Sequence, residues 1–348
     1  MTTLLTETLA RIRPIDPRWI ERARARQLQL TKPAGSLGRL EDVANRMAAI
    51  QETLAPAADR AVIVLFAADH GVCAEGVNPY PQAVTAQMVA NYLRGGAGIN
   101  ALARVAAVDL RVVDAGVAHD IPETAGLTQR AIARGTANFC QGPAMSPEQA
   151  VAALELGIEM SEAGAHLLGI GEMGIANTTS AAAITAALTG LDPTSVAGRG
   201  AGADDACMVR KRAALARALD LHGPHLRGPL EVLARLGGFE IGAMAGVCLG
   251  GAANRCAVVV DGFISTAAAA LAVRLCPAAA DYLIPAHRST EPGHAPLLEI
   301  IGHRPLLDLE MRLGEGTGAA LAIPVIRAAV AAFTGMATFQ SADVSEAS

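Results

Sequence analysis

One carboxylate, Glu315, stands between two glycines, Gly314 and Gly316, just before a long apolar run. Apolar neighbours disfavour the charged form of a carboxyl group, so its pKa rises and it becomes a better proton acceptor. The flanking glycines allow unusual backbone angles and a close approach by a substrate. A different explanation is that Glu315 lies at the N-terminal end of a helix over 317–333, where the helix dipole favours an acid. The residues alone leave both explanations open.

A second candidate is the loop GIGEMG, in which Gly169, Gly171 and Gly174 have the spacing GxGxxG between an apolar run and a helical pattern. This spacing is typical of dinucleotide binding, so an NAD-dependent oxidoreductase is one hypothesis. Two features argue against it. Glu172 would repel a pyrophosphate, and no clear strand-ending acid follows about 20 residues later. A glycine turn followed by a helix N-terminus can instead hold one phosphate, although ordinary capping explains the same pattern. The polar residues that would assist are Asn177, Thr178 and Thr179.

Other polar positions are weaker candidates when each is taken alone. One of the three cations at 210–212 could reach an anion, but a solvated helix face explains them equally well. Ser289, in a polar loop after an apolar run, could donate to a phosphate or cap a turn. The adjacent Asp69 and His70 point in different directions from a strand end. Without a third ligand at a recognisable spacing, they indicate structural hydrogen bonding rather than a metal site.

Composition excludes several classes of function. The net charge is −5 and aromatic residues make up 3%, so neither a basic surface for nucleic acid or anionic membranes nor stacking platforms for bases are expected. The longest apolar stretches are interrupted by Arg274, Pro324 and Arg327, and no membrane span is expected. The N-terminus lacks the pattern of a secretory signal. The six cysteines include no CxxC pair, which predicts a reduced, cytoplasmic compartment without disulfides or a cysteine metal site.

Five short apolar runs each end in polar residues or glycine. They are VIVLFAADHG (62–71), LRVVDAG (110–116), HLLGIGEMG (166–174), AVVVDGF (257–263) and DYLIPAH (281–287). Such runs suit strands that are buried on both faces. Helical patterns separate them, as in 146–165, where Ser146 and Pro147 supply a cap and a first-turn proline. Strands that alternate with helices predict an α/β fold with a parallel, Rossmann-like sheet flanked by helices.

The polar residues that end these runs are expected to meet, because ligands bind at the carboxyl ends of parallel strands. The five tails are Asp69-His70-Gly71, Asp114-Ala115-Gly116, Gly171-Glu172-Met173-Gly174, Asp261-Gly262 and His287-Arg288-Ser289. The two ends of the chain contain helical patterns without strands. We therefore predict an α/β catalytic domain over 56–315 and a small helical subdomain built from 1–55 and 316–348.

Six motifs, in order, resemble those of the nicotinate-nucleotide–dimethylbenzimidazole phosphoribosyltransferase family. They are KPAGSLGRLE (32–41), FAADHGV (66–72), GIGEMGIANTTSAAAI (169–184), GGFEIGAMAGVCLGGA (237–252), VVVDGFISTAAA (258–269) and MRLGEGTGAAL (311–321). The resemblance covers nearly the whole chain. It implies transfer of the phosphoribosyl group of nicotinate mononucleotide to 5,6-dimethylbenzimidazole, which gives α-ribazole 5′-phosphate for the lower ligand of cobalamin. It also implies a homodimer and no metal or other cofactor.

The resemblance assigns roles to individual residues. Glu315 matches the family's general base, and Glu172 matches a supporting residue of the active site. The phosphate-binding and ribose-binding positions correspond to Gly174, Ile175, Ala176, Asn177, Thr178, Lys211 and Ser289. Leu313 matches a wall of the base pocket. Tyr80 and Met88 stand where better-known members carry serine and glutamine, so the preferred acceptor base stays open. A protein that binds a nucleotide or base without catalysis is the remaining alternative.

Overall fold

The computed structural model describes residues 3–121, 125–161 and 164–345. Within these residues, six parallel strands form one sheet in the order β3-β2-β1-β4-β5-β6. The strands are β1 Ala61–Ala68, β2 Asp109–Gly116, β3 Leu127–Gln129, β4 Leu167–Met173, β5 Ala257–Val260 and β6 Leu283–Pro285. The five predicted strands and the parallel α/β fold are confirmed. The edge strand β3 was not predicted, because its three residues, LTQ, contain no apolar run.

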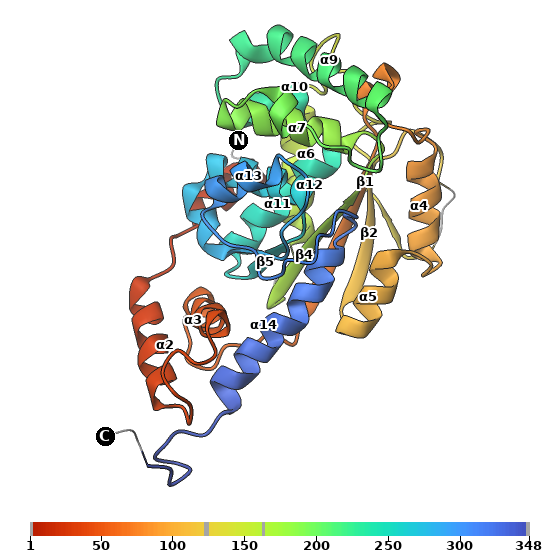
Figure 1. Ribbon diagram of the computed structural model, residues 1–348. Helices are drawn as coiled ribbons and strands as arrows, with labels where there is room; N and C mark the ends of the chain where they lie inside the picture. Colours follow the sequence, from red (N-terminus) through yellow and green to blue (C-terminus); the bar gives the residue numbers. More distant parts are fainter. Residues whose placement is uncertain (1–2, 122–124, 162–163, 346–348) are drawn as a thin grey trace.

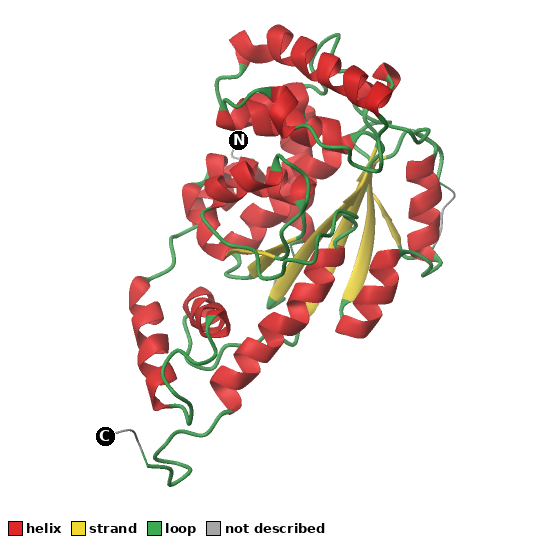
Figure 2. Ribbon diagram, in the orientation of Figure 1, coloured by secondary structure: helices red, strands yellow, loops and turns green. Residues whose placement is uncertain are grey.

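Helices cover both faces of the sheet (Figures 1 and 2). The helix α11 packs with α12 on one face, and α14 packs with α5 on the other. The helices are α1 Leu4–Arg11, α2 Pro17–Gln29, α3 Arg39–Gln51, α4 Val84–Leu93, α5 Gly98–Ala106, α6 Pro147–Met160, α7 Asn177–Thr189, α8 Pro193–Val196, α9 Asp205–His222, α10 Pro229–Leu236, α11 Phe239–Ala253, α12 Phe263–Leu275, α13 His294–Ile301 and α14 Thr317–Gly335, with short 3-10 helices at Gly71–Glu75, Gly223–His225 and Pro277–Tyr282. All eight residues of β1 are buried, as expected for a strand covered on both faces.

The start of α6 follows the predicted signals. Ser146 is the N-cap, its side chain accepts a hydrogen bond from the amide of Gln149, and Pro147 occupies the first helical position. The Gln149 side chain accepts from the Ser146 amide in return, at 2.9 Å, which completes a capping box. The helix ends at Met160, earlier than the sequence pattern suggested.

The helix α14 is long and apolar enough to cross a membrane, judged by length and composition alone. In the fold it packs against β4, β5 and α5, and half of its most apolar window is buried. Arg327 fastens it to the chain, since its guanidinium donates hydrogen bonds to the carbonyls of Ala58, Asp59, Ala106 and Ala107. These contacts make α14 a core helix of this fold.

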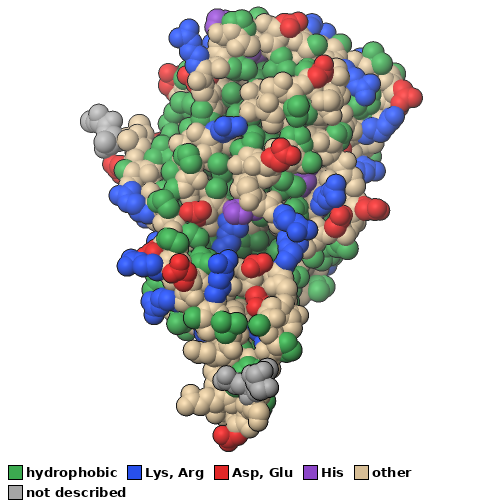
Figure 3. Space-filling model, turned by 60° about the vertical axis from the view of Figure 1, so that its left-hand side comes forward, with side chains coloured by type: hydrophobic (Ala, Val, Ile, Leu, Met, Phe, Trp, Pro, Cys, Tyr) green, Lys and Arg blue, Asp and Glu red, His purple; other side chains and the backbone are tan. Residues whose placement is uncertain are grey.

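Segments from both ends of the chain lie together at one end of the molecule. There α3 packs against α2 and α14 (Figure 1), whereas α1 packs against α6 and α11. The division into 1–55 with 316–348 and 56–315 stays a prediction. On the face shown in Figure 3, Lys and Arg side chains are interspersed with Asp and Glu, in agreement with a chain of small net charge.

Candidate active site

A cavity of about 680 Å³ opens at the carboxyl ends of β4 and β5. The residues predicted for the site that line it are Tyr80, Met88, Glu172, Gly174, Ile175, Asn177, Thr178, Ser289, Leu313 and Glu315. Two predicted residues lie behind its wall. Ala176 is the residue before α7 and is fully buried, with a φ of +77°. Lys211 lies behind Thr178, to which it donates a hydrogen bond.

The loop that carries Glu315 has an unusual backbone. Gly314, Glu315 and Gly316 have consecutive φ values of +84°, +64° and +85°. The left-handed conformation costs a non-glycine residue about 1–2 kcal/mol, so Glu315 must be held there by its surroundings. The prediction of unusual backbone angles is therefore confirmed. The expectation that both glycines admit substrate is wrong for Gly316, which packs against Ile63 and Gly171 instead.

The Glu315 carboxylate is buried at the cavity and lies at the N-terminus of α5. Its Oε2 atom accepts a hydrogen bond from the amide of Ile99 at 3.2 Å, whereas the helix's own Asn100 side chain accepts only the amide of the N-cap residue, Ala97. Burial raises the pKa of Glu315, while the Ile99 amide and the nearby Tyr92 hydroxyl oppose that rise. The carboxylate therefore faces the cavity and serves a helix N-terminus, but that helix is α5 rather than the predicted helix over 317–333.

Glu172 lies across the same cavity, at the end of β4, and is almost fully buried. Its Oε2 atom accepts a hydrogen bond from the side-chain amide of Asn177. Burial, together with the negative charges of Asp261, Glu240 and Glu315, raises the pKa of Glu172 to about 8. At neutral pH this pKa favours the protonated form of Glu172.

The raised pKa of Glu172 predicts a stability that depends on pH. Its value of about 8 in the fold lies above the ordinary 4.5. The stability that the protonated form contributes is therefore complete below pH 4.5 and is lost as the pH rises through about 8. Replacing Glu172 with glutamine, which is neutral at every pH, should raise Tm relative to wild type at pH 9 and much less at pH 5. Thermal unfolding at both pH values measures this, and equal shifts would contradict it.

The part of the cavity beside α7 is suited to an anion. The helix α7 begins there at Asn177 without a side-chain cap, so its first amides lack a side-chain acceptor. The Lys211 ammonium donates to Thr178 Oγ1 at 2.9 Å and to the Gly198 carbonyl at 3.0 Å. Burial lowers the pKa of Lys211 to about 8. The Ile175 amide donates to Thr85 Oγ1, and the Asn177 and Thr179 amides donate to the carbonyls of Gly174 and Ala176, so an anion would bind to the remaining polar groups of this loop.

The expected convergence of strand tails is correct for three strands. Residues from the tails of β4, β5 and β6 line the cavity, including Asp261 and His287. The acids in the tails of β1 and β2 bind backbone amides instead. Asp69 accepts from the Ala118 amide, and Asp114 accepts from the amides of Gly116 and Val117. Among the residues not singled out in the sequence, Glu291 and Arg312 also line the cavity. Arg312 lies within the motif MRLGEGTGAAL, which could have marked it, whereas no local pattern marks Glu291.

The glycines of the GxGxxG pattern have a different purpose from that in dinucleotide-binding loops. Gly169 and Gly171 lie inside β4, before the strand ends. A Cβ atom at Gly171 would lie 2.5 Å from the Glu315 carbonyl oxygen, and one at Gly169 would lie 2.6 Å from Ile63 Cγ1. They let the Glu315 loop and α14 pack closely on the strand. The structure therefore does not favour the oxidoreductase hypothesis.

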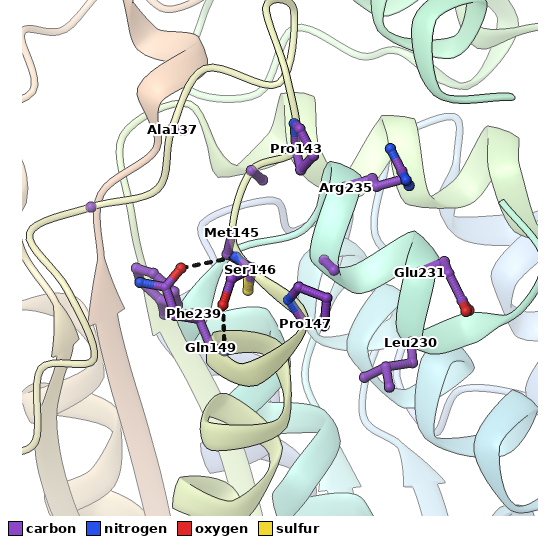
Figure 4. A pocket seen from close by; sticks show the side chains of 13 residues that line it. Ala137, Pro143, Met145, Ser146, Pro147, Gln149, Leu230, Glu231, Arg235 and Phe239 are labelled. Atoms are coloured by element: carbon purple, nitrogen blue, oxygen red, sulfur yellow. Dashed lines mark hydrogen bonds between the residues drawn. The ribbon is translucent and has the colours of Figure 1, made fainter. Parts of the chain in front are cut away.

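A second cavity, of about 500 Å³, lies between the segment 135–149 and the helix α10 (Figure 4). Its walls are mainly apolar, with Met145, Leu230 and Phe239 among them. Ser146 and Gln149 also line it, but they bond to each other in the capping box of α6. Polar groups suited to chemistry thus gather in the first cavity.

Comparison with known proteins shows similarity over the full chain. A family model described as phosphoribosyltransferase matches residues 12–344. The nicotinate-nucleotide–dimethylbenzimidazole phosphoribosyltransferases of Geobacter sulfurreducens and Chloroflexus aggregans are each 52% identical over 348 residues, which is 99% of this chain and 99% of theirs. The crystal structure of the enzyme of that name from Thermus thermophilus is 50% identical and has a TM-score of 0.90. The match covers 96% of this chain and 100% of that one.

Proposed function

This chain belongs to the phosphoribosyltransferase family that acts on nicotinate nucleotide and dimethylbenzimidazole, and on that premise we propose that Glu315 is the general base of the reaction. The observation that carries the proposal is the placement of one buried carboxylate with a raised pKa on the wall of the cavity where the polar groups gather. Glu172, which is protonated at neutral pH, is not suited to accept a proton.

The chemistry requires one base. Nicotinate mononucleotide carries a pyridinium at C1′, so its departure yields a neutral pyridine nitrogen and needs little help from an acid. The acceptor attacks C1′ through one ring nitrogen, while its other ring nitrogen loses a proton. Glu315 accepts that proton, and its negative charge stabilises the oxocarbenium character of the transition state. Attack on the face opposite the departing nicotinate gives the α-configured product.

The acceptor base is proposed to lie beside Tyr80, Met88 and Leu313, which line the cavity near Glu315. A thioether and two large apolar surfaces suit a flat heterocycle. A competition assay with dimethylbenzimidazole, benzimidazole and adenine, read by the mass of the riboside product, ranks the acceptors. Nicotinate release without any riboside product would contradict a transferase.

We propose that phosphate binds at the N-terminus of α7, beside Ser289, with the Lys211 ammonium behind Thr178 supplying positive charge to the site. Replacing Lys211 with methionine should raise KM for nicotinate mononucleotide roughly ten- to a hundredfold, because that buried positive charge is lost. Steady-state kinetics measure this. Arg210→Met is the matched control, since the exposed Arg210 donates to the Gly76 carbonyl and should keep KM within about twofold. Equal effects of the two variants would contradict the assignment.

A homodimer is also part of the proposal. Two apolar side chains at the cavity are exposed in the single chain, Tyr80 by 50% and Leu313 by 61%. We propose that a second copy of the chain covers the parts of these side chains that the acceptor base leaves exposed. Sedimentation equilibrium of the wild-type protein tests the dimer, and a monomer at micromolar concentration would contradict it.

We further propose a cytoplasmic location. All six cysteines are free thiols, and Cys207, Cys248 and Cys256 are buried. Unpaired thiols in these numbers suit a reducing compartment. Fractionation of the producing cell with an antibody to this chain tests the location, and recovery outside the cytoplasmic fraction would contradict it.

A further inference from the structure

A buried carboxylate that the mechanism does not use lies beside the loop of Glu315. Asp261 follows β5 and is 1% exposed. Its Oδ2 atom accepts a hydrogen bond from the Gly316 amide at 3.1 Å, and its Oδ1 atom accepts from the Gly318 amide at 2.6 Å. The helix α14 has no side-chain cap of its own. Asp261 therefore caps α14 from a neighbouring strand.

These two hydrogen bonds fix the backbone on the C-terminal side of Glu315. The Gly316 amide belongs to the peptide group that Glu315 begins, and both residues have positive φ. A non-glycine residue such as Glu315 keeps a positive φ only where neighbouring groups hold its backbone in that conformation. On the other side of this peptide group the absence of a Cβ at Gly171 leaves room for the Glu315 carbonyl. Gly171 in β4 thus leaves room for this backbone conformation of Glu315 and Gly316, and the hydrogen bonds to Asp261 hold it in place.

The neighbours of Asp261 keep it in the charged, accepting form. Burial raises the pKa of Asp261 to about 6, while His287 and the backbone amides oppose that rise. The His287 Nε2 atom lies 3.7 Å from Asp261 Oδ1. Gly318 leaves room for both side chains, because a Cβ there would overlap with His287 and Asp261. At neutral pH, Asp261 is accordingly ionised, and each of its carboxylate oxygens accepts a hydrogen bond from a backbone amide.

We propose that Asp261 is a positioning residue for this reaction, which holds the strained Glu315 loop so that the Glu315 carboxylate faces the acceptor base. The inference rests on the proposed function of Glu315. Asp261 acts through Glu315, because its oxygens are committed to the Gly316 and Gly318 amides. Its removal should misplace the base and leave the proposed phosphate contacts at α7 and the charge of Lys211 in place.

The test is a double-mutant cycle with nicotinate mononucleotide and dimethylbenzimidazole as substrates. Asp261→Ala should lower kcat about 100-fold, a loss typical of a misplaced catalytic group, and leave KM for nicotinate mononucleotide within about threefold. Asp261→Asn keeps one oxygen that can accept an amide hydrogen and should lose less. It is also the variant to use if Asp261→Ala does not fold. Unchanged kcat in both variants would overturn the inference.

The combination with Glu315→Gln separates positioning from general destabilisation. If Asp261 acts through Glu315, the double variant should be no slower than Glu315→Gln alone, because the base is already absent. Losses that multiply would overturn the inference. A wild-type rate in Glu315→Gln alone would instead overturn the proposed base and, with it, the premise of this inference.

Asp114→Ala is the matched control. Asp114 lies near the carboxyl end of β2, at the same edge of the sheet but separated from β5 by β1 and β4, and it also accepts two amide hydrogen bonds, from Gly116 and Val117, both at 2.9 Å. It does not line the cavity. We expect its kcat to stay within about twofold of wild type. A loss equal to that of Asp261→Ala would show a general effect of the sheet edge and overturn the assignment.

Discussion

Replacing Glu315 with glutamine should lower kcat for transfer to dimethylbenzimidazole by about 10²–10⁴-fold, the usual contribution of a general base. Glutamine has nearly the same shape and keeps an oxygen that can accept the Ile99 amide hydrogen, which caps α5. The variant cannot accept the proton of the attacking heterocycle. KM for nicotinate mononucleotide should change little, because Glu315 is not one of the residues proposed to bind its phosphate. Steady-state kinetics with both substrates measure the effect.

The control for this variant is its stability. Burial disfavours the charged form of Glu315 and raises its pKa, so the neutral glutamine should unfold at the same or a higher temperature than wild type. A slow variant with wild-type Tm supports the loss of a base. A variant that keeps near-normal kcat would show that Glu315 is not the base, whatever its stability.

The second large effect concerns a glycine that never touches the substrate. Gly171→Ala would place a Cβ atom 2.5 Å from the Glu315 carbonyl oxygen and 2.7 Å from the Gly316 amide. Both are backbone atoms held in a strained conformation, so the loop must move away from β4. We expect kcat to fall about 100-fold, as for other small displacements of a catalytic group. Kinetics well below the unfolding temperature of the variant measure this.

Gly169→Ala is the matched control for Gly171→Ala. Gly169 lies on the same face of β4, and its new Cβ atom would meet the Ile63 side chain at 2.6 Å and Ala319 Cβ at 3.3 Å. The Ile63 side chain can shift more easily than a backbone carbonyl. Gly169→Ala should therefore lose stability but much less kcat. Equal kcat losses in the two variants would contradict a specific link between β4 and the Glu315 loop.

The sequence was sufficient to predict the parts of the fold that depend on local pattern. Buried apolar runs predicted five strands, and the cap at Ser146 with the first-turn proline Pro147 predicted the start of α6. The glycines around Glu315 predicted its unusual backbone. The strand β3 escaped prediction because an edge strand of three residues has too few apolar positions to form a pattern.

Contacts between distant segments could not be predicted from local pattern. Glu315 caps α5, and Asp261 caps α14, so each helix takes its cap from another part of the chain. Local rules look for caps beside the helix that they serve. The GxGxxG spacing suggested dinucleotide binding for a related reason. Gly169 and Gly171 make room for a distant part of the chain, and this contact is visible only in the fold. Arg312 and Glu291 reach the cavity in the same way.

The most direct test of the central claim compares two acceptors in wild type and Glu315→Gln. Dimethylbenzimidazole must lose a ring proton when it is ribosylated, whereas 1-methylimidazole attacks through its free nitrogen and has no N–H proton to lose. If Glu315 accepts that proton, its replacement should slow transfer to dimethylbenzimidazole by about 10²–10⁴-fold and change kcat/KM for 1-methylimidazole by less than about tenfold. Equal losses with both acceptors would contradict the assignment of Glu315 as the general base.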